Sequence, residues 1–222
     1  MFRPLFAALL AGALIAPTAD SQLLTNGSFE NPNINSLGFY SLYNSGSTGI
    51  TGWTVLGLTG ESIALTPDTF LGLQASQGRQ WLDISGIYGY NKGMRSDAIA
   101  VTIGQTYRIG FDVGNLTVAG FGPATLGLAI NGGAEQLFVN AAPITGVFQM
   151  NWQSFFVDWT ADANTLSLDL VGRANGALGN DAGIGLDNVD VSLLSSSVPE
   201  PSTWALALTG LIAVGTVRRR RR

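Results

Sequence analysis

The sequence predicts an all-β protein built as an antiparallel sandwich of two sheets. In several short segments apolar residues alternate with polar ones at the period of two that marks a half-buried strand. Gly, Asn and Asp separate these segments at the spacing of roughly 8–12 residues that is typical of sandwiches and barrels. Between the two ends of the chain no segment shows the 3.6-residue period of an amphipathic helix. We therefore expect roughly nine or ten short strands.

Two strands are expected on either side of Gly104. Residues 107–113 place Tyr107, Ile109, Phe111 and Val113 on one face and Arg108, Gly110 and Asp112 on the other. Residues 98–103, AIAVTI, precede them, and Gly104-Gln105 suits a two-residue turn with Gly first. The pattern predicts a hairpin of these two strands.

The following segments continue the pattern to the end of the domain. Residues 124–130 and 135–140 flank Asn131-Gly132-Gly133, which predicts a second hairpin. An aromatic strand over 152–159 leads through the turn 161–164 into a strand over 165–172, and the last strand covers 185–193. The strand phases assign four aromatic residues to the core: Trp53, Phe111, Phe155 and Trp159.

The two ends of the chain have the composition of targeting segments. Residues 1–20 combine Arg3, an apolar run and small residues, as in a secretory signal peptide, with cleavage expected between Ala16 and Asp20. The sandwich then covers 21–194, and a Pro-containing linker covers 195–203. An uncharged run at 204–217 is shorter than the ~20 residues of a relaxed transmembrane helix. Five arginines at 218–222 would hold that end on the cytoplasmic side.

Charge and composition exclude several classes of function. Residues 21–197 hold five basic and 13 acidic residues, a net charge of about −8, which disfavours nucleic acid and anionic lipid. Such a surface suits a divalent cation or a neutral glycan. The chain has no Cys and no His, so disulfides, His-based catalysis and most zinc or copper sites are excluded. Asp112, Asp158 and Asp169 have no spacing that marks an acid–base pair, so we expect no enzyme.

The C-terminal end resembles the PEP-CTERM sorting signal. Its three parts stand in order: Val198-Pro199-Glu200-Pro201, the apolar run, and the basic tail of Arg218, Arg219, Arg220, Arg221 and Arg222. The resemblance implies an exosortase-type sorting protease as partner, in a Gram-negative bacterium that makes exopolysaccharide. It also implies a transient stage in the inner membrane, followed by release or attachment at the surface. The alternative is an ordinary single-span anchor.

The exported part is similar to galactose-binding-like jelly rolls. The segments LLTNGSFENP, ITGWTV, GRQWLDISG, GQTYRIGFDVGN and GIGLDNVDVSL occur in the order found in carbohydrate-binding modules and DUF642-type cell-wall proteins. The resemblance implies a jelly roll whose first and last strands lie side by side. Members commonly bind glycans, and many carry a structural calcium ion between the terminal segments.

Two acidic residues are candidate ligands of such a calcium ion. Period two places Asp187 on the apolar face with Val189, Val191 and Leu193, where a carboxylate is costly unless it is paired or metal-bound. Glu30 is its expected partner, because the first and last strands would be adjacent. Hard oxygen ligands suit calcium. The alternative is that Asp187 accepts backbone N–H bonds and that Glu30 is solvated.

Two loops contain the candidate glycan contacts. Exposed aromatic rings pack on the C–H faces of sugars, while amide and charged groups bond their hydroxyls. The first loop supplies Tyr40, Tyr43 and Asn44, and the second supplies Tyr88, Tyr90, Asn91, Lys92 and Arg95. Alternatively, these tyrosines cover the edge of the sandwich.

The sequence as a whole predicts an exported surface or biofilm-matrix protein that binds polysaccharide without catalysis. One alternative is a structural matrix protein without a glycan site. Another is a glycoside hydrolase or lyase on the same fold.

Overall fold

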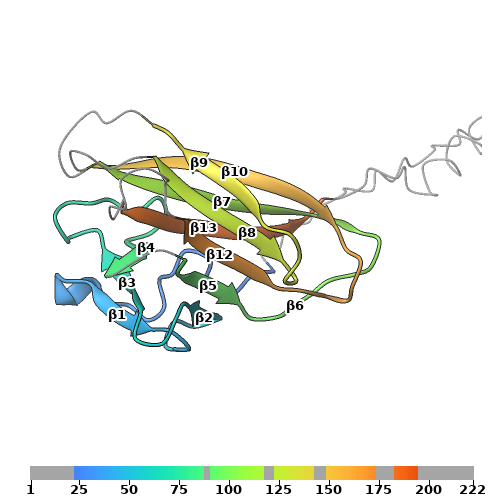
Figure 1. Ribbon diagram of the computed structural model, residues 1–222, viewed down its shortest axis with the longest axis horizontal. Helices are drawn as coiled ribbons and strands as arrows, with labels where there is room; N and C mark the ends of the chain where they lie inside the picture. The colour runs from blue at the N-terminus through green and yellow to red at the C-terminus, as the bar shows by residue number, and fades with distance from the viewer. Residues whose placement is uncertain (1–22, 88–90, 118–122, 143–148, 174–182, 195–222) are drawn as a thin grey trace, which may run out of the picture.

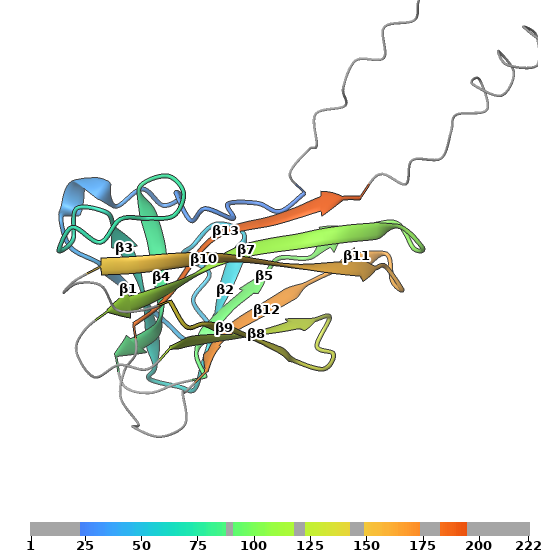
Figure 2. The same ribbon diagram turned by 90° about the horizontal axis from the view of Figure 1, so that it is seen from above.

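The computed structural model describes residues 23–87, 91–117, 123–142, 149–173 and 183–194. These residues form a jelly-roll sandwich of two antiparallel sheets, seen in two orientations in Figures 1 and 2. The chain passes repeatedly from one sheet to the other, so most neighbours within a sheet are distant in sequence. The predicted fold class is confirmed.

The larger sheet has six strands in the order β1, β3, β4, β13, β7, β10. Their bounds are β1 Ser41–Asn44, β3 Ser62–Pro67, β4 Gln80–Ile87, β13 Ile184–Leu193, β7 Thr106–Thr117 and β10 Gln149–Thr160.

The second sheet has five strands in the order β2, β5, β12, β8, β9. Their bounds are β2 Trp53–Leu56, β5 Gly93–Ser96, β12 Leu168–Arg173, β8 Ala124–Ile130 and β9 Gln136–Asn140. A two-stranded ladder joins β6 Ile99–Ala100 to β11 Thr165–Leu166, and a short 3-10 turn, η1, covers Asn35–Leu37.

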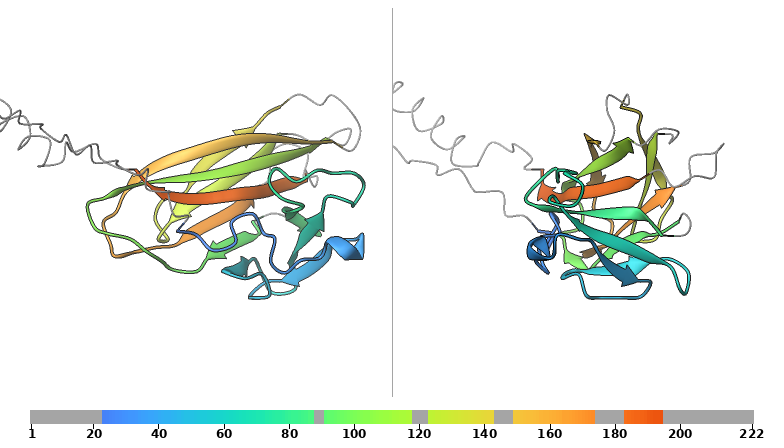
Figure 3. Two further views of the ribbon diagram at one scale, coloured as in Figure 1. Left: turned by 180° about the vertical axis from the view of Figure 1, so that it is seen from behind. Right: turned by 90° about the vertical axis from the view of Figure 1, so that its left-hand side faces the viewer.

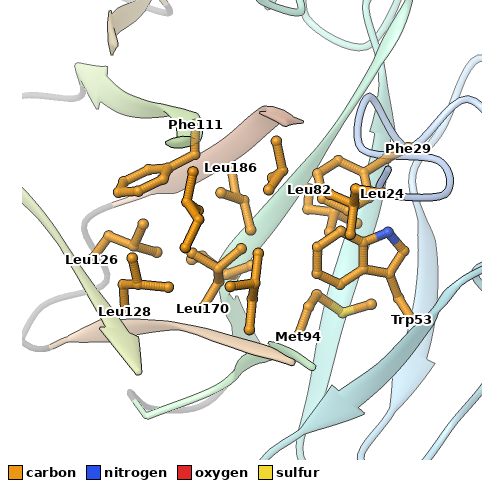
Figure 4. Packing of buried hydrophobic residues seen from close by; sticks show 14 of the residues in the cluster. Leu24, Phe29, Trp53, Leu82, Met94, Phe111, Leu126, Leu128, Leu170 and Leu186 are labelled. Carbon is orange, nitrogen blue, oxygen red and sulfur yellow. The ribbon is translucent and has the colours of Figure 1, made fainter. Parts of the chain in front are cut away.

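The core fills the space between the inner faces of the two sheets (Figure 4). Apolar side chains at alternate positions of β7, β8, β12 and β13 meet there, and Phe29 and Trp53 close one end with ring centroids 5.2 Å apart. Two of the four aromatic residues assigned to the core, Trp53 and Phe111, are wholly buried. Phe155 and Trp159 are partly buried against the cluster. Each fully buried Leu, Ile or Phe contributes about 1.5–3 kcal/mol, so this layer stabilises the sandwich.

The beginning of the domain lies beside its last strand. Leu23 N donates to Val191 O at 3.2 Å, and Val189 N donates to Gly27 O at 2.9 Å. The adjacency implied by the jelly-roll resemblance is therefore present, although the segment is not a regular strand. The C-terminal end of β13 and the η1–β1 region lie at opposite ends of the long axis (Figures 1 and 3).

One predicted hairpin is confirmed and the other is wrong. β8 and β9 pair antiparallel around Asn131, whose φ of 51° is the left-handed conformation that such a turn needs. By contrast, β6 pairs with β11 and not with β7. The turn at Gly104 does form, but Gly104 N bonds Ala161 O at 2.8 Å, so the chain enters β7 beside β10.

Several predicted segments lie outside the described residues. They are the signal peptide 1–20, the linker 195–203, the apolar run 204–217 and the tail 218–222. Over the part of the chain that is described, no helix has the length and hydropathy needed to cross a bilayer.

Candidate functional site

The motif NGSFE at residues 26–30 builds a tight corner next to β13. The Asn26 side chain holds the corner by donating to Asn31 O at 2.7 Å and Thr51 O at 3.0 Å, and its Oδ1 accepts from Asn31 N at 3.0 Å. Gly27 lies so close to β13 that a Cβ there would overlap the Val189 carbonyl oxygen. Phe29, at a φ of 55°, turns into the core. The corner thereby places Glu30 next to the start of β4.

Glu30 contacts the backbone that leads into β4. Its Oε1 accepts from Arg79 N at 2.7 Å and from Gln80 N at 2.8 Å. The Glu30 side chain also covers Gly78, where a Cβ would meet it. Glu30 therefore fixes one end of the segment 74–79, which we call the strap.

Asp187 fixes the other part of the strap, from a position that the sequence did not predict. We expected it on the apolar face, but a β-bulge between Asp187 and Asp190 shifts the register, with Asn188 at a φ of 50°. Asp187 therefore stands opposite Asp112 on the outer face of the six-stranded sheet, and it is buried because the strap covers it. Gln77 N donates to its Oδ2 at 2.8 Å and Asn188 N to its Oδ1 at 2.7 Å.

Asp112 is the second buried carboxylate beneath the strap. The Ser76 hydroxyl donates to its Oδ2, and Asn188 Nδ2 donates to the same oxygen at 3.1 Å. Desolvation raises the pKa of Asp187 to about 7, and the Asp112 charge adds to this. Backbone N–H groups of Gln77, Asn188 and Ser76 oppose the rise in pKa. The hydrogen bonds thus compensate the buried charge only in part.

The residues beneath the strap fit a hard cation in their chemistry. Glu30 and Asp187 both accept N–H bonds from residues 77–80, so two carboxylates, the hard oxygen ligands that calcium prefers, face the same segment. Asp187 accepts N–H bonds from Gln77 at Oδ2 and from Asn188 at Oδ1, and the Ser76 N–H also faces it. Among the described residues no group of three or more acidic residues gathers as a metal cluster. A cation here would therefore rely on backbone oxygens as well as on carboxylates.

Phe39 and Tyr40 of the first candidate glycan loop are exposed and lie against the half-buried ring of Phe70, which follows β3. We call these three rings the aromatic patch. Phe70 lies 5.3 Å from Tyr40 in an edge-on arrangement and 6.0 Å from Phe39, measured between ring centroids. Phe39 is 69% exposed and Tyr40 39% exposed. Aromatic pairs normally gain from burial, so rings that pair yet remain in solvent form a surface suited to an apolar ligand face.

The other two residues of that loop differ from Tyr40. Tyr43 packs partly against the core, and its ring covers Gly49. Asn44 is exposed at the end of β1. Tyr40 and Asn44 are therefore exposed, while Tyr43 covers the edge of the sandwich.

The second candidate loop leads onto the outer face of the five-stranded sheet. Arg95 lies there with its guanidinium bound through two nitrogens to Asp169, at 2.6 Å each. Arg173 forms a similar pair with Glu135, and its Nη1 donates to Asn91 Oδ1 at 2.6 Å. Asn91 and Arg95 thus belong to two ion-paired groups on one sheet face.

Lys92 is wholly buried, contrary to its expected place on the loop surface. Its Nζ lies 3.5 Å from Ser85 O, and its side chain lies near Gly57. In this position it contacts the interior and not a surface ligand. Tyr88 and Tyr90 lie outside the described residues.

Sequence reasoning missed three parts of these sites. Phe39 could have been identified from the sequence, because it is next to Tyr40, whereas Phe70 is brought to the patch only by the fold. Asp112 was assigned to an outward face, and nothing local in the sequence shows that Ser76 covers it.

Comparison with known families identifies the C-terminal segment. Residues 197–222 match the PEP-CTERM protein-sorting motif, so the chain carries a signal for export and processing at the membrane. The matched range contains Val198, Pro199, Glu200, Pro201 and all five terminal arginines, which lie outside the described residues. No curated protein sequence matches the chain.

Three solved structures illustrate which folds the sandwich is similar to. The CBM22-1 xylan-binding domain of Paenibacillus barcinonensis Xyn10C is 20% identical, with a TM-score of 0.39, over 72% of this chain and 96% of that one. A family 35 carbohydrate-binding module from Clostridium thermocellum is 15% identical, with a TM-score of 0.43, over 70% and 98%. An arabinose-bound α-L-arabinofuranosidase, MgGH51, is 13% identical, with a TM-score of 0.47, over 79% of this chain and 27% of that one.

Proposed function

We propose that this protein is exported, processed by an exosortase-type protease and presented at the cell surface or in the biofilm matrix, where it binds polysaccharide without catalysis. The sorting motif at 197–222 supports the export and processing. The sequence resemblance to carbohydrate-binding modules supports the ligand class. The exopolysaccharide of the producing cell is the partner that best fits a protein with this sorting signal.

The observation that carries the proposal is the aromatic patch. Phe70 contacts the rings of both Phe39 and Tyr40, and Phe39 and Tyr40 stay exposed, although a monomeric domain gains more by burying such side chains. Sugar rings present flat C–H faces of matching size, and the exposed amide of Asn44 lies on the adjoining strand β1. The patch therefore offers a stacking surface, and Asn44 offers a hydrogen-bonding group on the strand that follows it.

The outer face of the five-stranded sheet supplies a second region for the same polymer. Asn91, Arg95 and Arg173 present polar groups there, and Leu137 and Val139 on β9 are exposed beside them. A polysaccharide is long enough to use more than one region, and modest contacts then add through multivalency.

Binding is tested with the full chain, purified in a detergent without a sugar headgroup, on a panel of polysaccharides that includes the exopolymer of the producing strain. We expect retention by at least one polymer, with no release of reducing sugar. The double substitution of Phe39→Ala with Tyr40→Ala should weaken binding about tenfold or more, because stacked rings contribute roughly 1–3 kcal/mol. Phe156→Ala is a matched control, since Phe156 is 60% exposed on β10, away from the patch.

The outcomes separate the alternatives. If Phe156→Ala weakens polysaccharide binding as much as the double substitution does, the patch is not the binding site. A folded protein that binds no polymer would indicate a structural matrix protein. Release of reducing sugar would indicate a hydrolase, and an unsaturated product would indicate a lyase.

We also propose a structural calcium ion beneath the strap, held by Glu30, Asp187 and backbone carbonyls of the strap. The support is the buried, partly compensated charge of Asp187. Calcium would supply positive charge to that carboxylate and fasten the strap to β13. Addition of calcium to metal-free protein should raise the melting temperature, and Glu30→Gln should reduce that rise. An unchanged melting temperature after EDTA treatment would show that the assignment is wrong.

A further inference from the structure

We propose that the polymer recognised by this protein is uncharged, and that uronic acid-rich or sulfated polysaccharides are excluded. The inference rests on the proposed polysaccharide binding and names the class of its ligand. It follows from where the few cationic side chains of the domain are placed and from what each of them contacts.

Every arginine of the domain is already paired with a carboxylate. The five basic residues between 23 and 194 are all among the described residues. Four of them are arginines with acidic partners: Arg79–Asp68 at 3.5 Å, Arg95–Asp169 at 2.6 Å, Arg108–Asp158 at 2.8 Å and Arg173–Glu135 at 2.5 Å. The fifth, Lys92, is wholly buried. No cation of the domain is both exposed and without an acidic neighbour.

An anionic sugar would gain little by replacing one of these partners. Arg95 and Arg108 each hold their carboxylate through Nε and Nη2, the two-point geometry in which a guanidinium binds a carboxylate best. A glycan carboxylate that took this place would exchange one such pair for another. It would also leave the displaced Asp169 or Asp158 charged beside it. The exchange therefore gains no free energy from the ion pair itself, and it adds repulsion between the displaced carboxylate and the glycan carboxylate.

The net charge of the domain opposes anionic polymers at longer range. Residues 21–197 carry a net charge of about −8. This charge repels a polyanion, and at about 0.10–0.15 M salt the repulsion is largely screened only at separations greater than about 8–10 Å. A neutral polysaccharide meets no such barrier. The Asp169 pair occupies Nε and Nη2 of Arg95, so its Nη1 can donate to a hydroxyl without breaking the pair.

The test compares neutral and anionic soluble polymers on the full chain. Arabinoxylan, galactomannan, dextran and hydroxyethylcellulose represent the neutral class, and alginate, polygalacturonate and dextran sulfate the anionic class. We expect binding only within the neutral class, at 20 mM and at 300 mM NaCl, with affinities that change less than about twofold with salt. One series of measurements contains EDTA. Binding to a uronate that depends on a bridging calcium ion is then recognised because EDTA abolishes it.

A gain-of-function pair tests the arginine argument directly. Asp169→Asn and Asp158→Asn each remove one negative charge and each release one arginine, Arg95 or Arg108. Asp169→Asn should acquire salt-sensitive binding to polygalacturonate, because Arg95 lies on the proposed binding face. Asp158→Asn is the matched control on the six-stranded sheet and should acquire less. Circular dichroism verifies that both variants are folded.

Each outcome supports or overturns a different statement. Binding of wild-type protein to an anionic polymer in EDTA at 300 mM NaCl overturns this inference and leaves polysaccharide binding intact. Failure of wild-type protein to bind either class overturns the proposed function, and this inference falls with it. If Asp169→Asn and Asp158→Asn gain polyuronate binding equally, net charge and not the Arg95 pair sets the ligand class, which overturns the pairing argument.

Discussion

Gln80 joins the N-terminal corner to β4 through three hydrogen bonds, and its replacement should destabilise the whole sandwich. The side chain is wholly buried. Its Nε2 donates to Phe29 O at 2.8 Å and to Pro32 O at 2.9 Å, and its Oε1 accepts from Ile34 N at 2.5 Å. Gln80→Ala would leave three backbone groups without their partner.

The cost can be estimated from these contacts. Each lost bond that leaves a buried group unsatisfied costs about 1–1.5 kcal/mol or more, so the total is roughly 3–5 kcal/mol. Gln80→Glu keeps the shape and the Oε1 acceptor, and its charged form has no donor for the two carbonyl contacts, whereas its protonated form keeps one O–H donor. It should destabilise more at pH 8 than at pH 4, because a charged carboxylate would face two carbonyl oxygens.

Urea unfolding followed by tryptophan fluorescence measures the change, since Trp53 and Trp81 are buried. Gln105→Ala, at an exposed position in the turn before β7, is the control and should change the free energy of unfolding by less than about 0.5 kcal/mol. If Gln80→Ala falls within that same limit, the three bonds do not hold the corner and the reasoning fails.

Three further predictions concern the corner, the bulge and the strap. Gly27→Ala should lower the free energy of unfolding by about 1–3 kcal/mol, because the new Cβ would overlap the Val189 carbonyl. Gly110→Ala should be tolerated, since the nearest atom would lie 3.9 Å from the new Cβ. Equal melting temperatures for the two variants would contradict this. Asn188 has a φ of 50°, so Asn188→Val should destabilise by about 1–2 kcal/mol more than Asn188→Gly, and urea titration would reveal any reversed order. Burial raises the pKa of Asp187 to about 7, well above the value of about 3.9 in an unfolded chain. The folded state therefore holds this proton more tightly, and the stability gained below about pH 4 should be lost as the pH rises to about 7, by up to about 4 kcal/mol in EDTA. Asp187→Asn should flatten this dependence, and an unchanged slope in thermal melts from pH 4 to 8 would assign it to other groups.

The strands themselves were predictable because they depend on short-range alternation. Residues 107–113 and 124–130 form strands with the predicted faces, since the side-chain period of two is a property of each strand alone. The pairing of 98–103 was not predictable in the same way. Its turn was recognised correctly, but whether the chain stays in one sheet or crosses to the other depends on distant partners.

The candidate sites depend still more on distant contacts. A bulge at Asn188 reverses the face of Asp187, and a bulge leaves no distinct signal in the pattern of apolar residues. Asp187 and Asp112 are covered by Gln77 and Ser76, which lie far away in the sequence. Tyr40 was identified from its loop, whereas its neighbour Phe70 was not, because only the fold brings residues 39–40 and 70 together.

The position of β13 determines how the domain responds to pulling. It lies between β4 and β7 in the middle of the six-stranded sheet, and eight of its residues are in register with β7. Traction applied beyond its C-terminal end acts along the strand, while its backbone bonds run across it. Those bonds are therefore sheared together and are not peeled apart one at a time, so a cell that held the domain by its C-terminal end would hold it by a mechanically resistant strand.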